Sequence, residues 1–265
     1  MDYAIAFILF LILPYFALLS FIIGIIYRIY SWMHVHGLTA LRSVSLIPNS
    51  FGIRDIFVDL VKRVTTFHTL RKMEKDTPLT VGAMMFHYGI WISLLGHIAM
   101  IVPLPISLKV HEMIALYIGA PAGILAAVGL LILIFRRIFV GKMRKISSLE
   151  DYFISFLLIS VIIFGIVQTL YIRPNFMATV SPWLISIFQF HPEVATMTSV
   201  GLVTIVHITL AFLFIACIPY TKMIHIISYL FQPTITKKSF SVQAKVEDIK
   251  GGVSTPAKEV GDSGR

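Results

Sequence analysis

Four of the nine histidines stand out, because they lie inside long apolar runs or just past the end of one that is expected to continue, where an ionisable side chain is costly to keep. His87 and His97 share one run, while His207 lies in another and His225 just past its end. Neutral imidazole is a common ligand of metals and of haem iron, so metal coordination is the first chemistry to consider. A lone buried histidine is more often a hydrogen-bonded structural group. The metal hypothesis therefore requires these four side chains to be brought into pairs.

The elements that must position the histidines are transmembrane helices. The chain is 57% hydrophobic and 13% charged, about half the charged share of an ordinary soluble protein. Uncharged apolar runs of about 20 residues indicate bilayer-spanning helices, whereas a membrane barrel would show short alternating strands. We predict an all-α integral membrane bundle of five helices, bent or loosened at Pro14 and Pro121. The predicted spans are about Ile5–Tyr27, Val81–Val102, Met113–Phe135, Tyr152–Leu170 and Ala195–Ile218.

Basic residues predict the orientation of this bundle. They gather after the first, third and fifth spans, whereas the two remaining loops carry only Lys109 and Arg173. Loops rich in Lys and Arg stay in the cytoplasm, so we expect the N-terminus outside and the C-terminus in the cytoplasm of a multi-pass cell-membrane protein. The net charge of +9 has the same explanation, and no nucleic-acid partner is expected.

The predicted organisation is a transmembrane domain over residues 1–235 and a polar, flexible tail over residues 236–265. The domain includes a long cytoplasmic loop over residues 32–79. Within that loop, Ile53–Met73 mixes apolar and basic residues. This mixture fits an interfacial amphipathic helix or a surface helix covered by a partner. The single cysteine, Cys217, excludes a disulfide, a cysteine-held iron–sulfur cluster and a cysteine-based zinc site within this chain.

Helix direction sorts the four histidines into two pairs. The second span runs outward, which places His87 at the inner level and His97 at the outer level, about 15 Å apart along the axis. The fifth span runs inward and is expected to continue through His225. The spacing from His207 to His225 is then about five turns, so both lie on one helix face. Antiparallel neighbours would match His87 with His225 at the inner level and His97 with His207 at the outer level.

Each pair of imidazoles can hold one planar cofactor from both sides, and haem iron fits this requirement. Two b-type haems with both axial positions filled would carry single electrons across the membrane. Gly89 and Gly96 would let a flat macrocycle approach the backbone. No Asp, Glu, Lys or Arg lies within the predicted spans, which disfavours a di-iron site and a proton-coupled transporter. A haem-free membrane anchor remains the alternative of another class, followed by a metal or solute transporter.

Two further groups of residues have more than one interpretation. His111 begins the third span near the depth of the outer pair and could be the proton or hydrogen-bond partner of a quinone. Lys109 competes for that role, and a capping or interfacial histidine is the simpler alternative. Arg136 and Arg137 could hold haem propionates through charge-assisted bonds, or they could be ordinary cytoplasmic anchors.

The sequence resembles the gamma subunit of respiratory nitrate reductase, a membrane dihaem cytochrome b, over nearly all five spans. The shared motifs are LPY at 13–15 and FIIG at 21–24; FHYGI at 86–90 and LLGH at 94–97; GAPAG at 119–123 with Arg136 and Arg137 after it; and VHITL at 206–210, then IPY at 218–220 with His225 beyond. The histidine spacings of both spans match those of the family.

This resemblance implies that His87 and His225 bind the inner haem iron, and His97 and His207 the outer one. It implies quinol oxidation near the outer haem, with His111 in place of the family's quinol-site lysine and Gly96 beside the outer ligand His97. Electrons would pass to an iron–sulfur subunit and on to a molybdenum catalytic subunit, with the quinone pool and membrane lipid as further partners. The first loop is longer than in the common form, so a heterodisulfide-reductase- or sulfite-reductase-linked complex is the alternative.

Overall fold

The computed structural model describes residues 3–34, 58, 61–62, 64–67, 70–71, 76–102, 106–225 and 227. The chain forms two compact units. The first contains Met1–Tyr30 and Phe67–Ile224, and the second contains Ser31–Thr66 and His225–Arg265. Most of the loop segment interpreted as an interfacial or partner-covered helix, and the whole C-terminal tail, lie outside the described residues.

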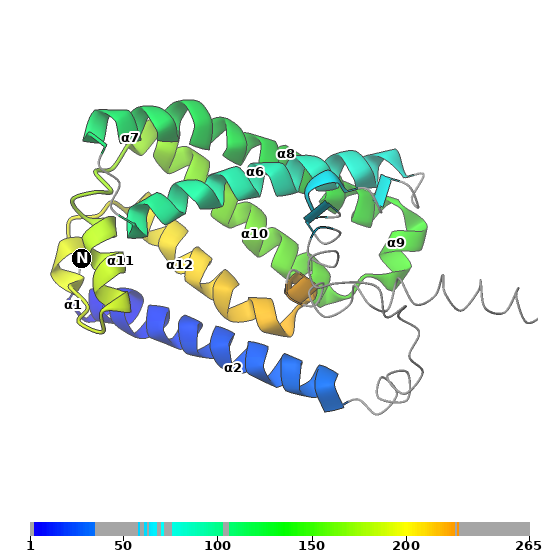
Figure 1. The fold of residues 1–265 in the computed structure, drawn as a ribbon, viewed down its shortest axis with the longest axis horizontal. Helices are drawn as coiled ribbons and strands as arrows, with labels where there is room; N and C mark the ends of the chain where they lie inside the picture. The colour runs from blue at the N-terminus through cyan, green and yellow to red at the C-terminus, as the bar shows by residue number, and fades with distance from the viewer. Residues whose placement is uncertain are drawn as a thin grey trace, which may run out of the picture. The chain divides into compact units, whose positions relative to one another are not determined.

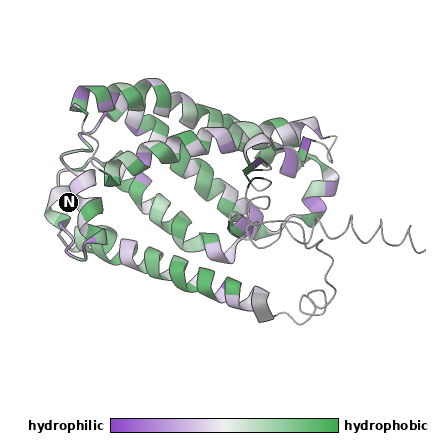
Figure 2. Cartoon of the chain, in the orientation of Figure 1, coloured by the Kyte–Doolittle hydropathy of each residue, from purple (hydrophilic) through white to green (hydrophobic). Residues whose placement is uncertain are grey.

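Five helical segments are long and apolar enough to cross a membrane, and the described residues contain no strand, which confirms the all-α prediction with five spans (Figure 1). Figure 2 shows hydrophobic residues along most of their length. The orientation of the termini stays a prediction. The segments are α1 (Tyr3–Phe7), η1 (Ile8–Ile12) and α2 (Leu13–His34); α6 (Thr77–Ile101); α7 (Leu108–Ile114), η2 (Ala115–Gly119) and α8 (Ala120–Phe139); α10 (Leu149–Val167) and η3 (Gln168–Ile172); and α12 (Leu202–Cys217) with η5 (Ile218–Tyr220).

Both intrahelical prolines follow a π-helical turn, as expected for a loosened helix: η1 precedes Pro14, and η2 precedes Pro121. Pro14 has no N–H to offer the carbonyl of Phe10 one turn earlier. The indole nitrogen of Trp183 donates to that carbonyl instead, at 2.9 Å. Trp183 is 1% exposed and lies on α11 (Val180–Phe188), so this bond ties α11 to the first span.

The helix α11 was not predicted, and the predicted start of the fifth span at Ala195 is wrong. Residues 194–197 form the short 3-10 helix η4 (Val194–Met197), and α12 begins at Leu202 after Gly201. The hydroxyls of Thr196 and Thr198 donate to carbonyls three residues earlier. Such local bonds compete with regular helix, and the fifth candidate membrane span accordingly begins only at Leu202.

Glycines bring α6 and α8 into close backbone contact. A Cβ on Gly129 would lie 2.3 Å from the backbone nitrogen of Phe86, and one on Gly89 would lie 2.5 Å from the backbone nitrogen of Ala126. Gly82 also faces the carbonyl of Gly129. Small residues at such a crossing let two membrane helices pack tightly. The prediction that Gly89 faces a flat macrocycle is therefore wrong, because this position packs on α8.

The prediction that the fifth helix continues through His225 is wrong. α12 ends at Cys217, Pro219 lies in η5, and Thr221 is extended with φ −117° and ψ 174°. A second 3-10 turn, η6 (Lys222–Ile224), follows. Since proline has no N–H for the helix and an extended residue breaks its phase, counting α-helical turns cannot place His225 on the face of His207.

Candidate histidine sites and the pocket beside them

The structure brings His97 and His207 together, as the outer pairing predicted. His97 lies near the end of α6 and His207 in the first half of α12, with ring centroids 6.2 Å apart and ring planes 31° apart. α6 packs along α8 and α12 packs along α10, so these two imidazoles meet between helices that have separate main partners. His207 is buried, and His97 is exposed in the chain taken alone.

One nitrogen of each ring is held by a backbone carbonyl. Nδ1 of His97 bonds to the carbonyl of Ser93 at 2.7 Å, and Nδ1 of His207 bonds to the carbonyl of Val161 on α10 at 2.9 Å. A carbonyl accepts only from N–H, so Nδ1 is the protonated nitrogen and Nε2 keeps its lone pair. Histidines that bind metals commonly use this arrangement, which fixes both the tautomer and the ring direction.

Gly165 on α10 makes room for the His207 ring. A Cβ at this position would lie 3.0 Å from Cε1 and 3.4 Å from Nδ1 of that imidazole. Contacts of that length are tight, so a larger residue here would push the ring off its present line. Gly165 was not predicted as a site residue, because nothing in the spacing of α10 indicates a contact with α12.

The distance between the two rings fits one iron atom between them. A metal–imidazole bond is about 2 Å long and the ring centre lies about 1 Å beyond the nitrogen, so two axial imidazoles place their centroids about 6 Å apart. The observed separation is 6.2 Å. Among the described residues, no three His, Cys, Asp or Glu side chains gather into a site for a bare metal ion. A haem needs only two axial side chains, so the donor set suits haem better than a free ion.

A backbone carbonyl also holds the ring of His87, whose Nδ1 lies 2.7 Å from the carbonyl oxygen of Ala83. Its ring lies among aromatic rings, with centroids 5.0 Å from Phe86, 5.3 Å from Phe67 and 5.9 Å from Trp91. His225 belongs to the second unit, so its pairing with His87 stays a prediction.

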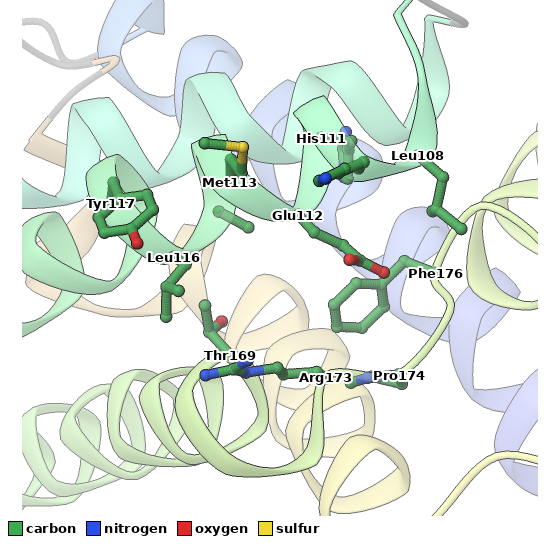
Figure 3. A pocket seen from close by; sticks show the side chains of 12 residues that line it. Leu108, His111, Glu112, Met113, Leu116, Tyr117, Thr169, Arg173, Pro174 and Phe176 are labelled. Carbon is green, nitrogen blue, oxygen red and sulfur yellow. The ribbon is translucent and has the colours of Figure 1, made fainter.

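A pocket of about 290 Å³ lies between α7 with η2 and the end of the fourth span (Figure 3). His111 and Lys109 line it, but Gly96 is not among its lining residues, and the quinol site stays a prediction. Glu112 and Arg173 also line the pocket and were not predicted to do so. Figure 3 shows the carboxylate of Glu112 extending toward the side of the pocket formed by Phe176 and Arg173.

The pocket is linked to the surroundings of His207 through one turn of the fourth span. Thr169 lines it, and the hydroxyl of Thr169 donates to the carbonyl of Gly165 at 2.9 Å. A Cβ on Gly165 would in turn lie 3.0 Å from the ring of His207. The fourth span therefore connects this pocket to the surroundings of His207. The signal available in the sequence was Arg173, which stands alone as a basic residue in its loop.

The two arginines at the end of α8 contact protein carboxylates. Nε of Arg136 donates to Asp76 at 2.8 Å, and Nη1 of Arg137 lies 3.0 Å from the carboxylate of Asp151. The hydroxyl of Ser147 also accepts from Arg137, at 3.1 Å. These contacts link α8 to the first turns of α6 and α10. Contact of either guanidinium with a haem propionate stays a prediction.

The contact between Asp76 and Arg136 predicts a stability change with pH. The guanidinium, together with the backbone N–H of Leu79, lowers the pKa of the Asp76 carboxyl below its usual value. A carboxyl whose pKa is lower in the folded state stabilises the fold above its ordinary pKa, and this stability is lost as the pH falls through the lowered pKa. Asp76→Asn should therefore lower the thermal unfolding temperature in detergent at pH 7, and the difference from the native chain should narrow below about pH 4.

Asparagine can still cap a helix, so this variant removes the charge and keeps the cap of α6. Glu193→Gln, at an exposed acid elsewhere, is the matched control and should show no such difference. A gap between Asp76→Asn and the native chain that stays constant from pH 7 to pH 3 would contradict the assignment.

Five membrane-length helices define a multi-pass membrane protein, and facing imidazoles lie between two of them. The family model of the nitrate reductase gamma subunit matches residues 64–239, well over half of the chain. The nitrate reductase gamma chain of Bacillus subtilis is 32% identical over 161 residues, covering 57% of this chain and 72% of the relative. This chain belongs to the nitrate reductase gamma subunit family, as the resemblance of its motifs predicted.

Two other relatives widen the comparison. The Hdr-like menaquinol oxidoreductase cytochrome b-like subunit of Archaeoglobus profundus is 25% identical over 261 residues, covering 85% of this chain and 77% of the relative. The nitrate reductase-like protein NarX of Mycobacterium tuberculosis is 27% identical over 178 residues, covering 61% of this chain and 27% of the relative. Membership of this group makes the chain a cell-membrane subunit of an electron-transfer oxidoreductase, as expected.

Proposed function

We propose that this chain is the cytochrome b subunit of a respiratory oxidoreductase, with two bis-histidine b-type haems. It would oxidise quinol at the outer side of the membrane and pass the electrons to an iron–sulfur partner subunit. The observation that carries this proposal is the outer pair, His97 and His207, whose ring centroids are 6.2 Å apart and whose Nδ1 atoms are both held by carbonyls. His87 and His225 are the proposed inner pair.

Haem, when bound, supplies one-electron redox chemistry that the side chains lack. The chain's residues supply position and proton handling. Carbonyls of Ser93 and Val161 hold the outer imidazoles in the tautomer that leaves Nε2 available. Oxidation of quinol to quinone releases two electrons and both hydroxyl protons, and His111 in the pocket is the proposed proton acceptor. Lys109 also lines the pocket, whereas Gly96, the third residue of the proposed quinol site, does not. Basic residues after the first and third spans would face the cytoplasmic partner.

The complex we propose is a nitrate reductase, with a molybdenum catalytic subunit beyond the iron–sulfur subunit. The family match and the identity to a nitrate reductase gamma chain support this choice. A second candidate is a complex like the Hdr-like menaquinol oxidoreductases, because that alignment extends over 85% of this chain, compared with 57% for the gamma chain. Affinity purification of the tagged chain from its own membranes would separate the two through the catalytic subunit and its metal content.

A visible difference spectrum of the purified chain tests the proposal directly. We expect two b-type haems per chain, reducible by dithionite and by a quinol analogue. A chain purified from haem-sufficient cells without an alpha band would contradict the cytochrome function and favour the membrane-anchor alternative.

The pocket leads to a separate prediction on quinol oxidation. His111→Ala should slow quinol-driven haem reduction by about tenfold or more, because a positioned proton acceptor accelerates proton transfer by at least this much. The dithionite-reducible haem content should not change. His191→Ala, at an exposed histidine after α11, is the matched control. A native rate in His111→Ala with a tenfold loss in Lys109→Ala would transfer the role to Lys109.

A further inference from the structure

The break after α12 leaves open which contacts position His225. Between Cys217 and His225 the chain contains the 3-10 helices η5 and η6 with the extended residue Thr221 between them. Side-chain contacts must therefore do what a continuous helix would have done. The end of this segment is well packed, because Ile224 is buried and Met223 packs against the apolar core formed by α6, α8 and α10.

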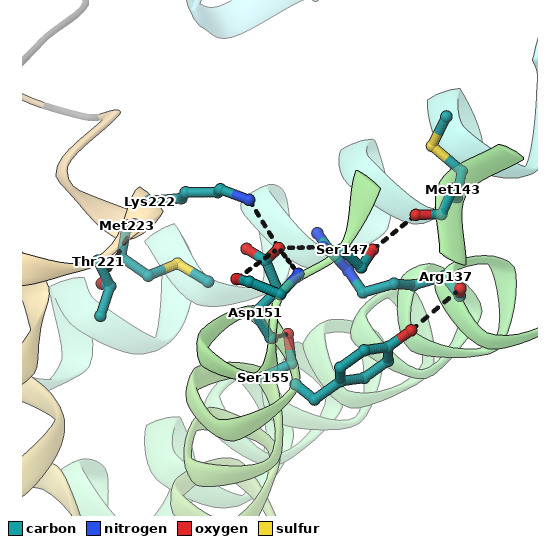
Figure 4. A network of polar contacts seen from close by, with 10 residues as sticks. Arg137, Met143, Ser147, Asp151, Ser155, Thr221, Lys222 and Met223 are labelled. Carbon is teal, nitrogen blue, oxygen red and sulfur yellow. Dashed lines mark hydrogen bonds and ion pairs between the residues drawn. The ribbon is translucent and has the colours of Figure 1, made fainter. Parts of the chain in front are cut away.

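Asp151 is the centre of the polar contacts that hold this segment (Figure 4). Its side chain is 2% exposed, and one carboxylate oxygen lies 2.6 Å from Nζ of Lys222 and 3.0 Å from Nη1 of Arg137. The backbone N–H of Ser148 donates to the same oxygen at 3.0 Å. One carboxylate thus links the end of α8, the start of α10 and η6. A buried carboxylate is costly without such partners, so these contacts stabilise one another.

Further bonds hold the turn that precedes Lys222. The hydroxyl of Thr221 donates to the carbonyl of Ile218 at 3.2 Å, and the side chain of Arg28 on α2 donates to the carbonyl of Pro219 at 2.8 Å. Consecutive Cα atoms are about 3.8 Å apart, so an anchored Ile224 limits where the backbone of the next residue begins. That residue is His225.

We infer that the ion pair between Asp151 and Lys222 is a positioning device for His225. It fixes the point at which the chain leaves the first unit and so sets the imidazole that the proposed function assigns to the inner haem. This inference rests on that proposed function. Neither residue is a ligand in the proposal, since both act through the backbone of η6. Loosening the pair should change how His225 would hold the inner haem and leave the outer haem, which His97 and His207 would hold, unchanged.

Lys222 is the better residue for the test. Asp151 also caps α10, so its removal would destabilise the helix whatever the role of His225. The side chain of Lys222 is 62% exposed, and its replacement should be tolerated by the fold. Lys222→Gln removes the charge, Lys222→Arg keeps it, and Lys145→Gln is a matched control at an exposed lysine of α9 (Gly141–Ile146).

The experiment is a redox titration of both haems in membranes that contain the full chain and its partners. His225→Ala and His97→Ala first assign the inner and outer signals by which haem each removes. We expect Lys222→Gln to change the reduced-to-oxidised ratio of the inner haem about tenfold at a fixed potential, or to remove that haem, with the outer haem unchanged. Lys222→Arg should restore the native titration.

The outcomes separate this inference from the function on which it rests. If both haems titrate as in Lys145→Gln, or both change equally, Lys222 does not position His225 and the inference is overturned. If His225→Ala removes no haem, the ligand assignment in the proposed function is wrong. Native membranes without haem would contradict the proposed function as a whole.

Discussion

Replacing His97 by alanine should remove one of the two haems and abolish quinol-driven reduction of the other. Alanine offers the iron no ligand, and the remaining imidazole of His207 cannot fill both axial positions. Haem content per chain should fall to about half. The surviving inner haem should still be reduced by dithionite, because the loss concerns the entry of electrons from quinol. Haem quantification with difference spectra under both reductants measures each part of this result.

The corresponding substitution of His207 tests whether His97 and His207 act as a pair. His207→Ala should remove the same haem as His97→Ala, and the double variant should lose no more than either single one, since both rings serve one iron. His191→Ala should keep both haems. If His97→Ala and His207→Ala remove different haems, the two imidazoles do not share an iron, despite ring centroids 6.2 Å apart.

The sequence could predict those parts of the fold that depend on hydrophobicity along the chain. Runs without charge predicted five helices, and the prolines at 14 and 121 predicted loosened turns. The same reasoning failed where local bonds oppose an apolar run. Hydroxyls of Thr196 and Thr198 accompany the 3-10 turn before α12, and Pro219 with Thr221 ends the helix before His225.

The candidate site also has parts that the sequence could predict and parts that it could not. Depth and helix direction were enough to pair His97 with His207, because both follow from counting residues along antiparallel helices. Contacts between helices distant in sequence could not be predicted. Gly165 beside His207 depends on how α10 packs on α12. The pocket position of Glu112 depends on α7, which starts at Leu108, before the predicted span begins at Met113.

The largest structural effect is expected at the crossing of α6 and α8. By helix propensity alone, Gly129→Ala should stabilise α8 by up to about 1 kcal/mol. The contact between the helices predicts the opposite sign. A Cβ here would lie 2.3 Å from the backbone nitrogen of Phe86 and 2.7 Å from the carbonyl oxygen of Gly82, and neither atom can move without its helix. Overpacking of this kind costs about 1–3 kcal/mol or more.

Because α6 carries both His87 and His97, separation of the two helices should also weaken both proposed haem sites. Thermal unfolding of Gly129→Ala in detergent, followed by haem absorbance, should show a lower midpoint and loss of both haems together. Gly141→Ala is the matched control, since a Cβ there meets no atom within 4 Å. A Gly129→Ala chain as stable as this control would mean that α6 and α8 pack at a greater distance, and the register that aligns His97 with His207 would then need revision.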